Sequence, residues 1–277
     1  TGGTGNVGLG SGNLGTAITT GTDNVAIGEA SLDAVTTGSD NTAVGDNAGG
    51  ALTTGGNNVA IGSGALLVAT TAADNTAVGT LALTANSSGT DNTAVGYAAG
   101  DAVTTGSDNT LVGDNAGGAI TTGGSNVAIG SAALLAATTA ADNTAIGTAA
   151  LTANTSGTDN VAVGYASLDA NTTGSDNTAI GDNALGANTT AANNTAVGSS
   201  ALLVNTTGAE NVAVGYNAGT AHTTGNGIVA IGDQALEANT TASYNTGVGK
   251  AALKVNTTGG NNVGIGSNAL DANTTAS

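Results

Sequence analysis

Residues 24–28 read Asn-Val-Ala-Ile-Gly, and residues 41–45 read Asn-Thr-Ala-Val-Gly. This pattern returns every 17 residues to the end of the chain, with no insertion or deletion between copies. A looser copy at residues 6–10 precedes the others, with one extra residue in the gap. A short fixed period predicts a solenoid in which each repeat forms one coil. The glycines that end the fifteen regular copies are Gly28, Gly45, Gly62, Gly79, Gly96, Gly113, Gly130, Gly147, Gly164, Gly181, Gly198, Gly215, Gly232, Gly249 and Gly266.

The residues of each coil, numbered from its Asn as positions 1 to 17, predict two short strands. Positions 1–4 are rich in β-branched residues and end at glycine, and positions 8–12 form a second apolar stretch. We therefore expect an all-β, parallel β-solenoid of about 16 coils, each adding about 4.8 Å to a rod. The whole chain, 1–277, is predicted to be one array, with an irregular first coil over 1–23 and regular coils over 24–277.

Two glycine columns behave differently along the repeats. Position 5 is glycine in every coil, which predicts a positive φ or a backbone approach too close for a Cβ atom. We expect it to be the sharp turn of the coil. Position 15 also accepts Ala, so a positive φ is not expected there. The alanines at position 15 are Ala72, Ala140, Ala191, Ala242 and Ala276.

Both faces of the first predicted strand are apolar. Position 4 is Val or Ile in the regular coils, and position 3, which points the opposite way, is nearly always Ala. One face can close the thin interior of the coil, but the other needs a partner. We therefore expect a homo-oligomer in which the Val/Ile columns of several chains meet on a shared axis.

The charge balance excludes several classes of partner. The chain has 2 Lys and Arg residues against 19 Asp and Glu, a net charge of −17, which argues against nucleic-acid binding. It has no cysteine and therefore no disulfide or thiolate metal site. Its apolar runs are too short to span a membrane. Few basic residues leave little for trypsin-like proteases to cut, which suits an extracellular location. Because the chain begins at Thr1, we expect a processed protein or a fragment.

The repeat resembles the head repeats of trimeric autotransporter adhesins and related repeats in phage tail fibres and bacterial surface fibres. The motif Asn-(Thr/Val)-Ala-(Val/Ile)-Gly-x-x-Ala carries the resemblance, as at residues 24–31 and 211–218, and it covers nearly the whole chain. The resemblance implies a left-handed parallel β-roll, three chains around an axis and a role in attachment. The family repeats are usually shorter than 17 residues, and its stalk, neck and membrane anchor have no counterpart in this sequence.

Position 17 is Asp in eight coils. Carboxylates stacked about 4.8 Å apart repel one another, so a cation between them would help. The interpretation we favour is a solvated acidic edge with, at most, weak Ca²⁺ binding and no other cofactor. The residues of this candidate cation edge are Asp23, Asp40, Asp74, Asp91, Asp108, Asp142, Asp159 and Asp176.

Position 12 changes from apolar residues to Asn along the chain, which predicts a partly exposed column with a more polar edge in the second half. Asn there is followed by Thr or Ser at positions 13 and 14, which makes N-glycosylation sequons, as does Asn193 at position 17. The favoured interpretation is a turn that uses Asn and Thr side chains for hydrogen bonds, as we also expect for the Asn column at position 1. The position-12 sequons are Asn86, Asn154, Asn171, Asn188, Asn205, Asn239, Asn256 and Asn273.

The sequence offers little for catalysis. His222 is the only histidine, and we expect it to replace Asn on the surface. Adjacent Thr columns suggest ice binding only weakly, because neighbouring strand residues point to opposite sides. We therefore predict a non-enzymatic, structural or adhesive extracellular rod: a head or shaft of a surface adhesin, a virion fibre or a fibril. Its expected partners are its own copies and a host surface, matrix or glycan. The alternatives are an extracellular filament, with or without glycosylation, built by end-to-end stacking, and a polysaccharide-active solenoid enzyme.

Overall fold

The computed structural model describes residues 3–14 and 17–277, and all regular elements in these ranges are three-residue strands. The chain forms two compact units, Thr1–Ala141 with β1–β8 and Asp142–Ser277 with β9–β16. The strands are β1 (Val7–Leu9), β2 (Val25–Ile27), β3 (Thr42–Val44), β4 (Val59–Ile61), β5 (Thr76–Val78), β6 (Thr93–Val95), β7 (Thr110–Val112), β8 (Val127–Ile129), β9 (Thr144–Ile146), β10 (Val161–Val163), β11 (Thr178–Ile180), β12 (Thr195–Val197), β13 (Val212–Val214), β14 (Val229–Ile231), β15 (Thr246–Val248) and β16 (Val263–Ile265).

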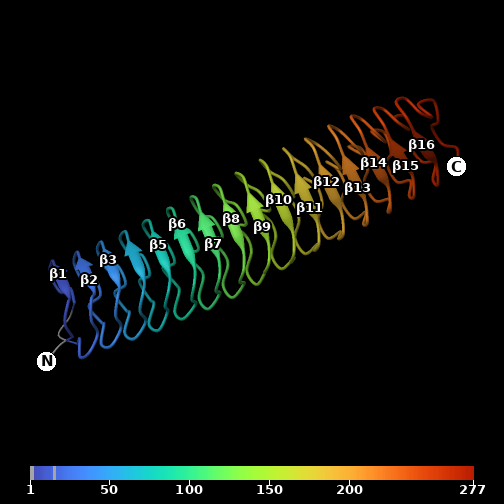
Figure 1. Ribbon diagram of the computed structural model, residues 1–277. Coiled ribbons are helices and arrows are strands. Elements are labelled where there is room, and N and C mark those ends of the chain that lie inside the picture. Colours follow the sequence, from blue (N-terminus) through green and yellow to red (C-terminus); the bar gives the residue numbers. More distant parts are fainter. Residues whose placement is uncertain (1–2, 15–16) are drawn as a thin grey trace. The chain divides into compact units, whose positions relative to one another are not determined.

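Within each unit, every strand pairs in parallel with the strand one coil further along (Figure 1). The register follows the repeat: β10 pairs with β11 so that Val161, Ala162 and Val163 face Thr178, Ala179 and Ile180. Even the looser first coil stays in register, since Gly8 of β1 lies opposite Ala26 of β2. The predicted parallel β-solenoid with 17-residue coils is therefore confirmed.

The second strand predicted at positions 8–12 is wrong, because this segment is a series of turns. In the first regular coil, Ala30 at position 7 has φ 50° and Leu32 at position 9 has φ 48°. Both angles are left-handed, whereas a strand needs negative φ. The turns still bond from coil to coil: the N–H of Leu32 donates to the carbonyl of Ala48 at 3.1 Å. The coil therefore gains backbone hydrogen bonds on this side without any extended backbone.

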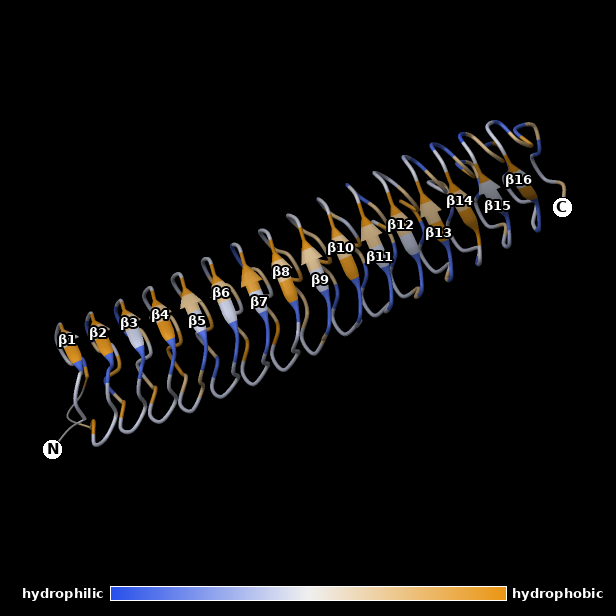
Figure 2. Ribbon diagram, in the orientation of Figure 1, coloured by the Kyte–Doolittle hydropathy of each residue, from blue (hydrophilic) through white to orange (hydrophobic). Residues whose placement is uncertain are grey.

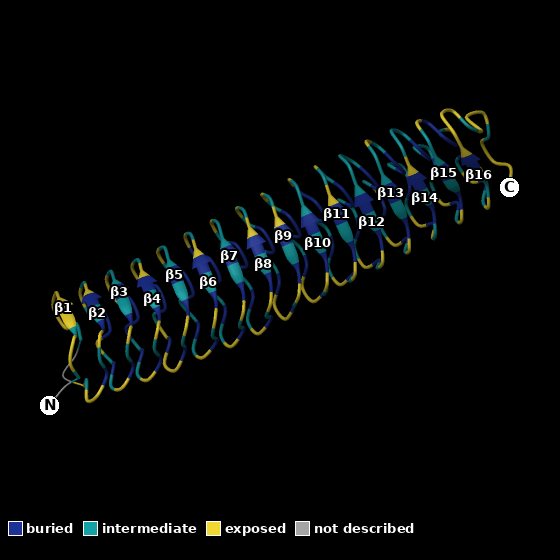
Figure 3. Ribbon diagram, viewed as in Figure 1, coloured by how far each residue is buried: buried dark blue, intermediate teal, exposed yellow. Residues whose placement is uncertain are grey.

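The core is a thin stack of small and medium side chains. Ala at position 3 of the strands and Leu at position 9 of the turns point inward, and Ala162 and Leu168 of one coil are both fully buried. Figure 3 shows the buried segments recurring at the same place in successive coils. Because no second layer covers the coil, the strand face opposite Ala is left on the outside.

The exceptions to the repeat compensate one another in space. Gly100 and Gly117 replace the usual Leu at position 9, and Leu111 is the only Leu at position 3. A Cβ atom at Gly100 would lie 2.5 Å from Leu111 Cδ1, and one at Gly117 would lie 2.7 Å from Leu111 Cδ2. Leu111 therefore fills the volume that two missing leucines leave. Similarly, Ile228 replaces the position-1 Asn beside Gly219, where a Cβ atom would lie 3.4 Å from Ile228 Cδ1.

The glycines at position 5 make the sharp turn that the sequence predicts. Their φ angles lie between 120° and 142°, a region essentially open only to glycine. A Cβ atom would also collide with the next coil, as at Gly164, where it would lie 2.6 Å from the carbonyl oxygen of Gly181. Position 5 therefore requires glycine both for its positive φ and for the close approach of the next coil. At position 15 no positive φ is found, for example at Gly38 and Gly174, which confirms the second expectation.

Candidate functional surfaces

The Asn column at position 1 is a buried hydrogen-bond ladder. Oδ1 of Asn24 accepts from both the backbone N–H and Nδ2 of Asn41, at 3.1 and 3.0 Å. Nδ2 of Asn41 also donates to the carbonyl of Gly55, at 3.0 Å. Since Asn58 donates to Oδ1 of Asn41 in the same way, Asn41 joins its own coil to both neighbours, and its amide is out of reach of solvent. The structural interpretation of this column is confirmed.

Position 12 forms a second ladder, so the expectation of a partly exposed column is wrong. Apolar members such as Leu52 and Ile120 are fully buried, and so are polar ones such as Asn171. Nδ2 of Asn171 donates to Asn154 Oδ1 at 3.1 Å and to the carbonyl of Gly174 at 2.9 Å. The column accepts both kinds of residue because Asn satisfies its own amide inside the coil. It is therefore no polar edge of the second half of the chain.

This burial bears directly on the sequons. An enzyme that attaches a sugar needs access to the Asn amide, and Asn86, like six other position-12 sequon residues, is fully buried. The folded chain presents only the sequons at Asn193, which is exposed, and Asn273, which is part-buried in the last coil. The seven fully buried residues are Asn86, Asn154, Asn171, Asn188, Asn205, Asn239 and Asn256.

His222 is buried in the position-12 column, so the expected surface location is wrong. Its Nε2 lies 2.7 Å from the carbonyl of Gly225, and its Nδ1 lies 3.3 Å from Nδ2 of Asn239. This geometry suits the neutral ring with the proton on Nε2, because Nδ1 must accept from an amide. Burial lowers the pKa of His222, and the hydrogen bond to Gly225 opposes this only partly. The ring also interrupts the ladder, since Oδ1 of Asn205, in the coil before His222, has no hydrogen-bond partner.

His222→Asn is therefore expected to stabilise the second unit by about 1–3 kcal/mol, because the new amide can donate to the unsatisfied Oδ1 of Asn205. The substitution should also remove a pH dependence. A lowered folded-state pKa means that the unfolded chain binds the proton first, so stability falls as pH drops below the ordinary value of 6.5. Thermal unfolding at pH 7.5 and at pH 5.5 measures both effects.

The outcome that contradicts this account is an equal drop in melting temperature between the two pH values for wild type and His222→Asn. Asn is a suitable replacement for His222, because Asn occupies position 12 in the coils on either side. Partial burial raises the pKa values of Asp101 and Asp169. These carboxyl groups therefore make the stability rise as pH falls, and they do so only at pH values nearer the ordinary carboxyl value of 3.8.

The Asp column at position 17 has a conformational explanation. Its members are exposed and left-handed, as Asp40 at φ 59° and Asp176 at φ 58° show. Asn193 and Tyr244 adopt the same φ at this position, so the angle does not depend on a carboxylate. Asp and Asn tolerate left-handed backbone better than most residues, which accounts for their frequency there. Among the described residues, no three His, Cys, Asp or Glu side chains gather as a metal ion would require.

The outward face of the strands carries a regular apolar surface. Position 3 points into the coil, so positions 2 and 4 point out, and the sequence alone left this choice open. Ile146, Ile180 and Ile231 at position 4 are 38–40 % exposed. In Figure 2 the strands are orange or pale, and the segments leading into them are blue. We call the position-4 Val and Ile residues of each unit its strand-face stripe.

No pocket is found over residues 3–14 and 17–277, and no helix in these ranges is long and apolar enough to cross a membrane. The fold and the buried ladders define the class of this protein as a parallel β-solenoid repeat protein. No protein-family model, curated protein or solved structure matches the chain.

Proposed function

We propose that this chain is a structural and adhesive segment of an extracellular or cell-surface fibre, acting without catalysis as a homotrimer of left-handed β-rolls. The observation that carries the proposal is the strand-face stripe, which recurs once per coil and stays uncovered in the single chain. The resemblance of the repeat to adhesin and fibre heads points the same way. The scarcity of basic residues suits an environment rich in proteases.

The stripe favours association because its side chains are apolar, β-branched and in register. Exposed Val and Ile at single sites are ordinary on a protein surface, but a continuous column is typical of an interface. Each residue buried there contributes through the area removed from water, at about 25 cal/mol per Å². Three chains can bring their stripes together on a common axis, which leaves the turn edges free for ligands.

The test is the mass of the assembly in solution, measured by light scattering after gel filtration. We expect three times the chain mass of 25.5 kDa. Replacing four consecutive stripe residues by Thr, namely Ile146, Val163, Ile180 and Val197, should reduce the mass to that of one chain. These side chains lie outside the core, so the far-ultraviolet circular dichroism spectrum should not change.

The matched control changes Val204 and Val255 to Thr. Both lie at position 11, and both are 37 % exposed, close to the value for stripe residues. The control should keep the trimer. A wild-type mass of 25.5 kDa at micromolar concentration would overturn the trimer, and a mass that rises continuously with concentration would favour the end-to-end filament instead. Turnover of a polysaccharide by the purified chain would favour the solenoid enzyme.

A further inference from the structure

All the tyrosines of this chain lie at its surface. The chain has no Phe or Trp, and its four tyrosines take no part in the core. Tyr97, Tyr165 and Tyr216 are 55–61 % exposed, and Tyr244 is 62 % exposed. The first three share position 6, directly after the turn glycine, beside the strand-face stripe but not in it. Large exposed aromatic rings placed at one position of a repeat point to recognition rather than to folding.

Each position-6 tyrosine has the same neighbours on the adjacent coils. The preceding coil has Thr or Ser at position 6 and the following coil has Asp, so that the three columns read Thr80–Tyr97–Asp114, Thr148–Tyr165–Asp182 and Ser199–Tyr216–Asp233. Backbone bonds fix this order, since the carbonyl of Tyr165 accepts from the N–H of Asn183, which follows Asp182 in the next coil, at 3.0 Å. The ring and the carboxylate therefore stand on successive coils, about 4.8 Å apart along the stack.

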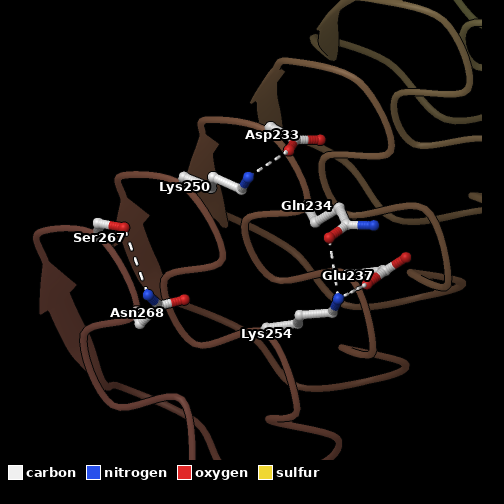
Figure 4. Close-up of polar contacts among 7 residues, drawn as sticks. All are labelled: Asp233, Gln234, Glu237, Lys250, Lys254, Ser267 and Asn268. Atoms are coloured by element: carbon white, nitrogen blue, oxygen red, sulfur yellow. Dashed lines mark hydrogen bonds and ion pairs between the residues drawn. The ribbon is translucent and has the colours of Figure 1, made fainter.

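In the third column a cation already pairs with the carboxylate. Lys250 occupies position 6 of the coil after Asp233, and its Nζ lies 3.8 Å from Asp233 Oδ2 (Figure 4). Lys254 does the same at position 10, with its Nζ 3.2 Å from Glu237 Oε2. The only two basic residues of the chain thus both sit one coil after an acidic residue of their own column.

The first two columns lack such a cation. The coil after Asp114 has Ser131 at position 6, and the coil after Asp182 has Ser199. We propose that Tyr97–Asp114 and Tyr165–Asp182 are binding sites for cationic side chains, Lys or Arg, of a basic partner protein. The ring face attracts a cation, and the neighbouring carboxylate pairs with it. At Tyr216–Asp233 the carboxylate is already paired with the chain's own Lys250.

Charge selects this partner over a glycan. The net charge of −17 attracts a basic chain from a distance and repels acidic polysaccharides, whereas a neutral sugar gains nothing from it. A single exposed cation–π pair contributes little, so the affinity of each site must come from the ring and the carboxylate acting together. This inference rests on the proposed adhesive function and adds the chemical class of the partner. The assembly mass and the binding of a peptide are separate measurements, so either can fail alone.

The experiment titrates the whole protein into a fluorescein-labelled octapeptide of alternating Arg and Gly, followed by fluorescence anisotropy at low salt. The double variant Tyr97→Thr/Tyr165→Thr should bind about two- to five-fold more weakly, the effect expected from losing an exposed cation–π contact. The double variant Asp114→Ser/Asp182→Ser should bind more weakly still. Thr and Ser occur naturally at position 6 of other coils, so both variants should fold, which thermal unfolding verifies.

Two controls separate these sites from diffuse negative charge. Asp108→Ser/Asp176→Ser removes the same charge from position 17, where Ser125 occurs naturally, and should leave the peptide affinity close to wild type. Lys250→Ser should open the third site and raise the number of peptides bound per chain from two to three.

Equal weakening by the position-17 and position-6 acidic variants would overturn the proposal, because general charge would then suffice. An unchanged stoichiometry in Lys250→Ser would contradict the block of the third site by Lys250. Tyrosine-dependent retention on a chromatography resin that carries a neutral glycan, without binding of the peptide, would show that the tyrosines bind sugars instead.

Discussion

Gly181→Ala is expected to destabilise the second unit by about 3 kcal/mol or more. The φ of Gly181 is 133°, where a residue with a Cβ atom is strained by about 1–3 kcal/mol. The new Cβ atom would also lie 2.6 Å from the carbonyl carbon of Gly198 and 2.9 Å from the nitrogen of Ser199. These are backbone atoms, so the clash cannot be relieved by rotating a side chain. Urea unfolding followed by circular dichroism measures the loss.

Gly186→Ala is the matched control in the same coil. Gly186 has no positive φ, and a Cβ atom there would come no closer than 3.4 Å to its nearest neighbour. We expect a change within about 0.5 kcal/mol, since Ala lowers the entropy of the unfolded chain at a compatible site. If Gly181→Ala and Gly186→Ala unfold at the same urea concentration, the turn column does not require glycine.

The period and the first strand could be predicted from the sequence because each produces its own residue pattern. The β-branched residues at positions 2 and 4 flank a small residue, and glycine ends the strand without exception. A column that admits only one residue type reports a backbone constraint, as the φ of Gly181 shows. Register follows from the period, because coils of equal length stack with equal positions in contact.

The turns at positions 7–11 could not be predicted from apolar pattern alone. Leu is unusual in left-handed backbone, yet Leu168 adopts φ 53° and is fully buried. The burial of its side chain offsets the local strain. The replacement of Leu by Gly at position 9, as at Gly117, indicates this left-handed backbone in the sequence, because glycine takes the same angle without strain.

The second Asn ladder could not be predicted from polarity alone, because polar columns are ordinarily exposed. In a coil of this width, an asparagine can bond its own turn and the next coil at once, so polarity and burial are compatible. The sequence did hold the signal: Asn at position 12 recurs with the spacing of the Asn at position 1. The neighbours of the position-6 tyrosines lie 17 residues away in the sequence, so only the register of the coils brings them together.

Asn177→Ala is expected to cost about 3 kcal/mol. Oδ1 of Asn177 accepts from the backbone N–H of Asn194 at 3.0 Å and from its Nδ2 at 3.2 Å. Without the side chain, a buried backbone N–H is left unsatisfied, and a void remains beside it. The control is Asn183→Ala at position 7, where Ala occurs naturally, as at Ala166. Equal melting temperatures for the two variants would show that the ladder adds no stability.

Asn177→Asp tests the direction of the ladder's hydrogen bonds. The side chain keeps its acceptor for Asn194 but loses the Nδ2 donor, which lies 3.1 Å from Asn160 Oδ1 and 2.9 Å from the carbonyl of Ala191. A buried carboxylate facing two acceptors should cost about 3–5 kcal/mol at neutral pH.

The folded state should therefore favour the protonated acid in Asn177→Asp and raise its pKa, so that stability recovers as pH falls through that raised value. This is the reverse of the trend that His222 imposes, since a raised carboxyl pKa makes the folded chain bind the proton first. Asn193→Asp is the control, because position 17 is exposed and Asp is common there. It should unfold like the wild type at neutral pH. A melting temperature of Asn177→Asp that does not rise relative to Asn193→Asp between pH 7 and pH 5 would mean that Nδ2 of Asn177 is not the donor to Asn160 and Ala191.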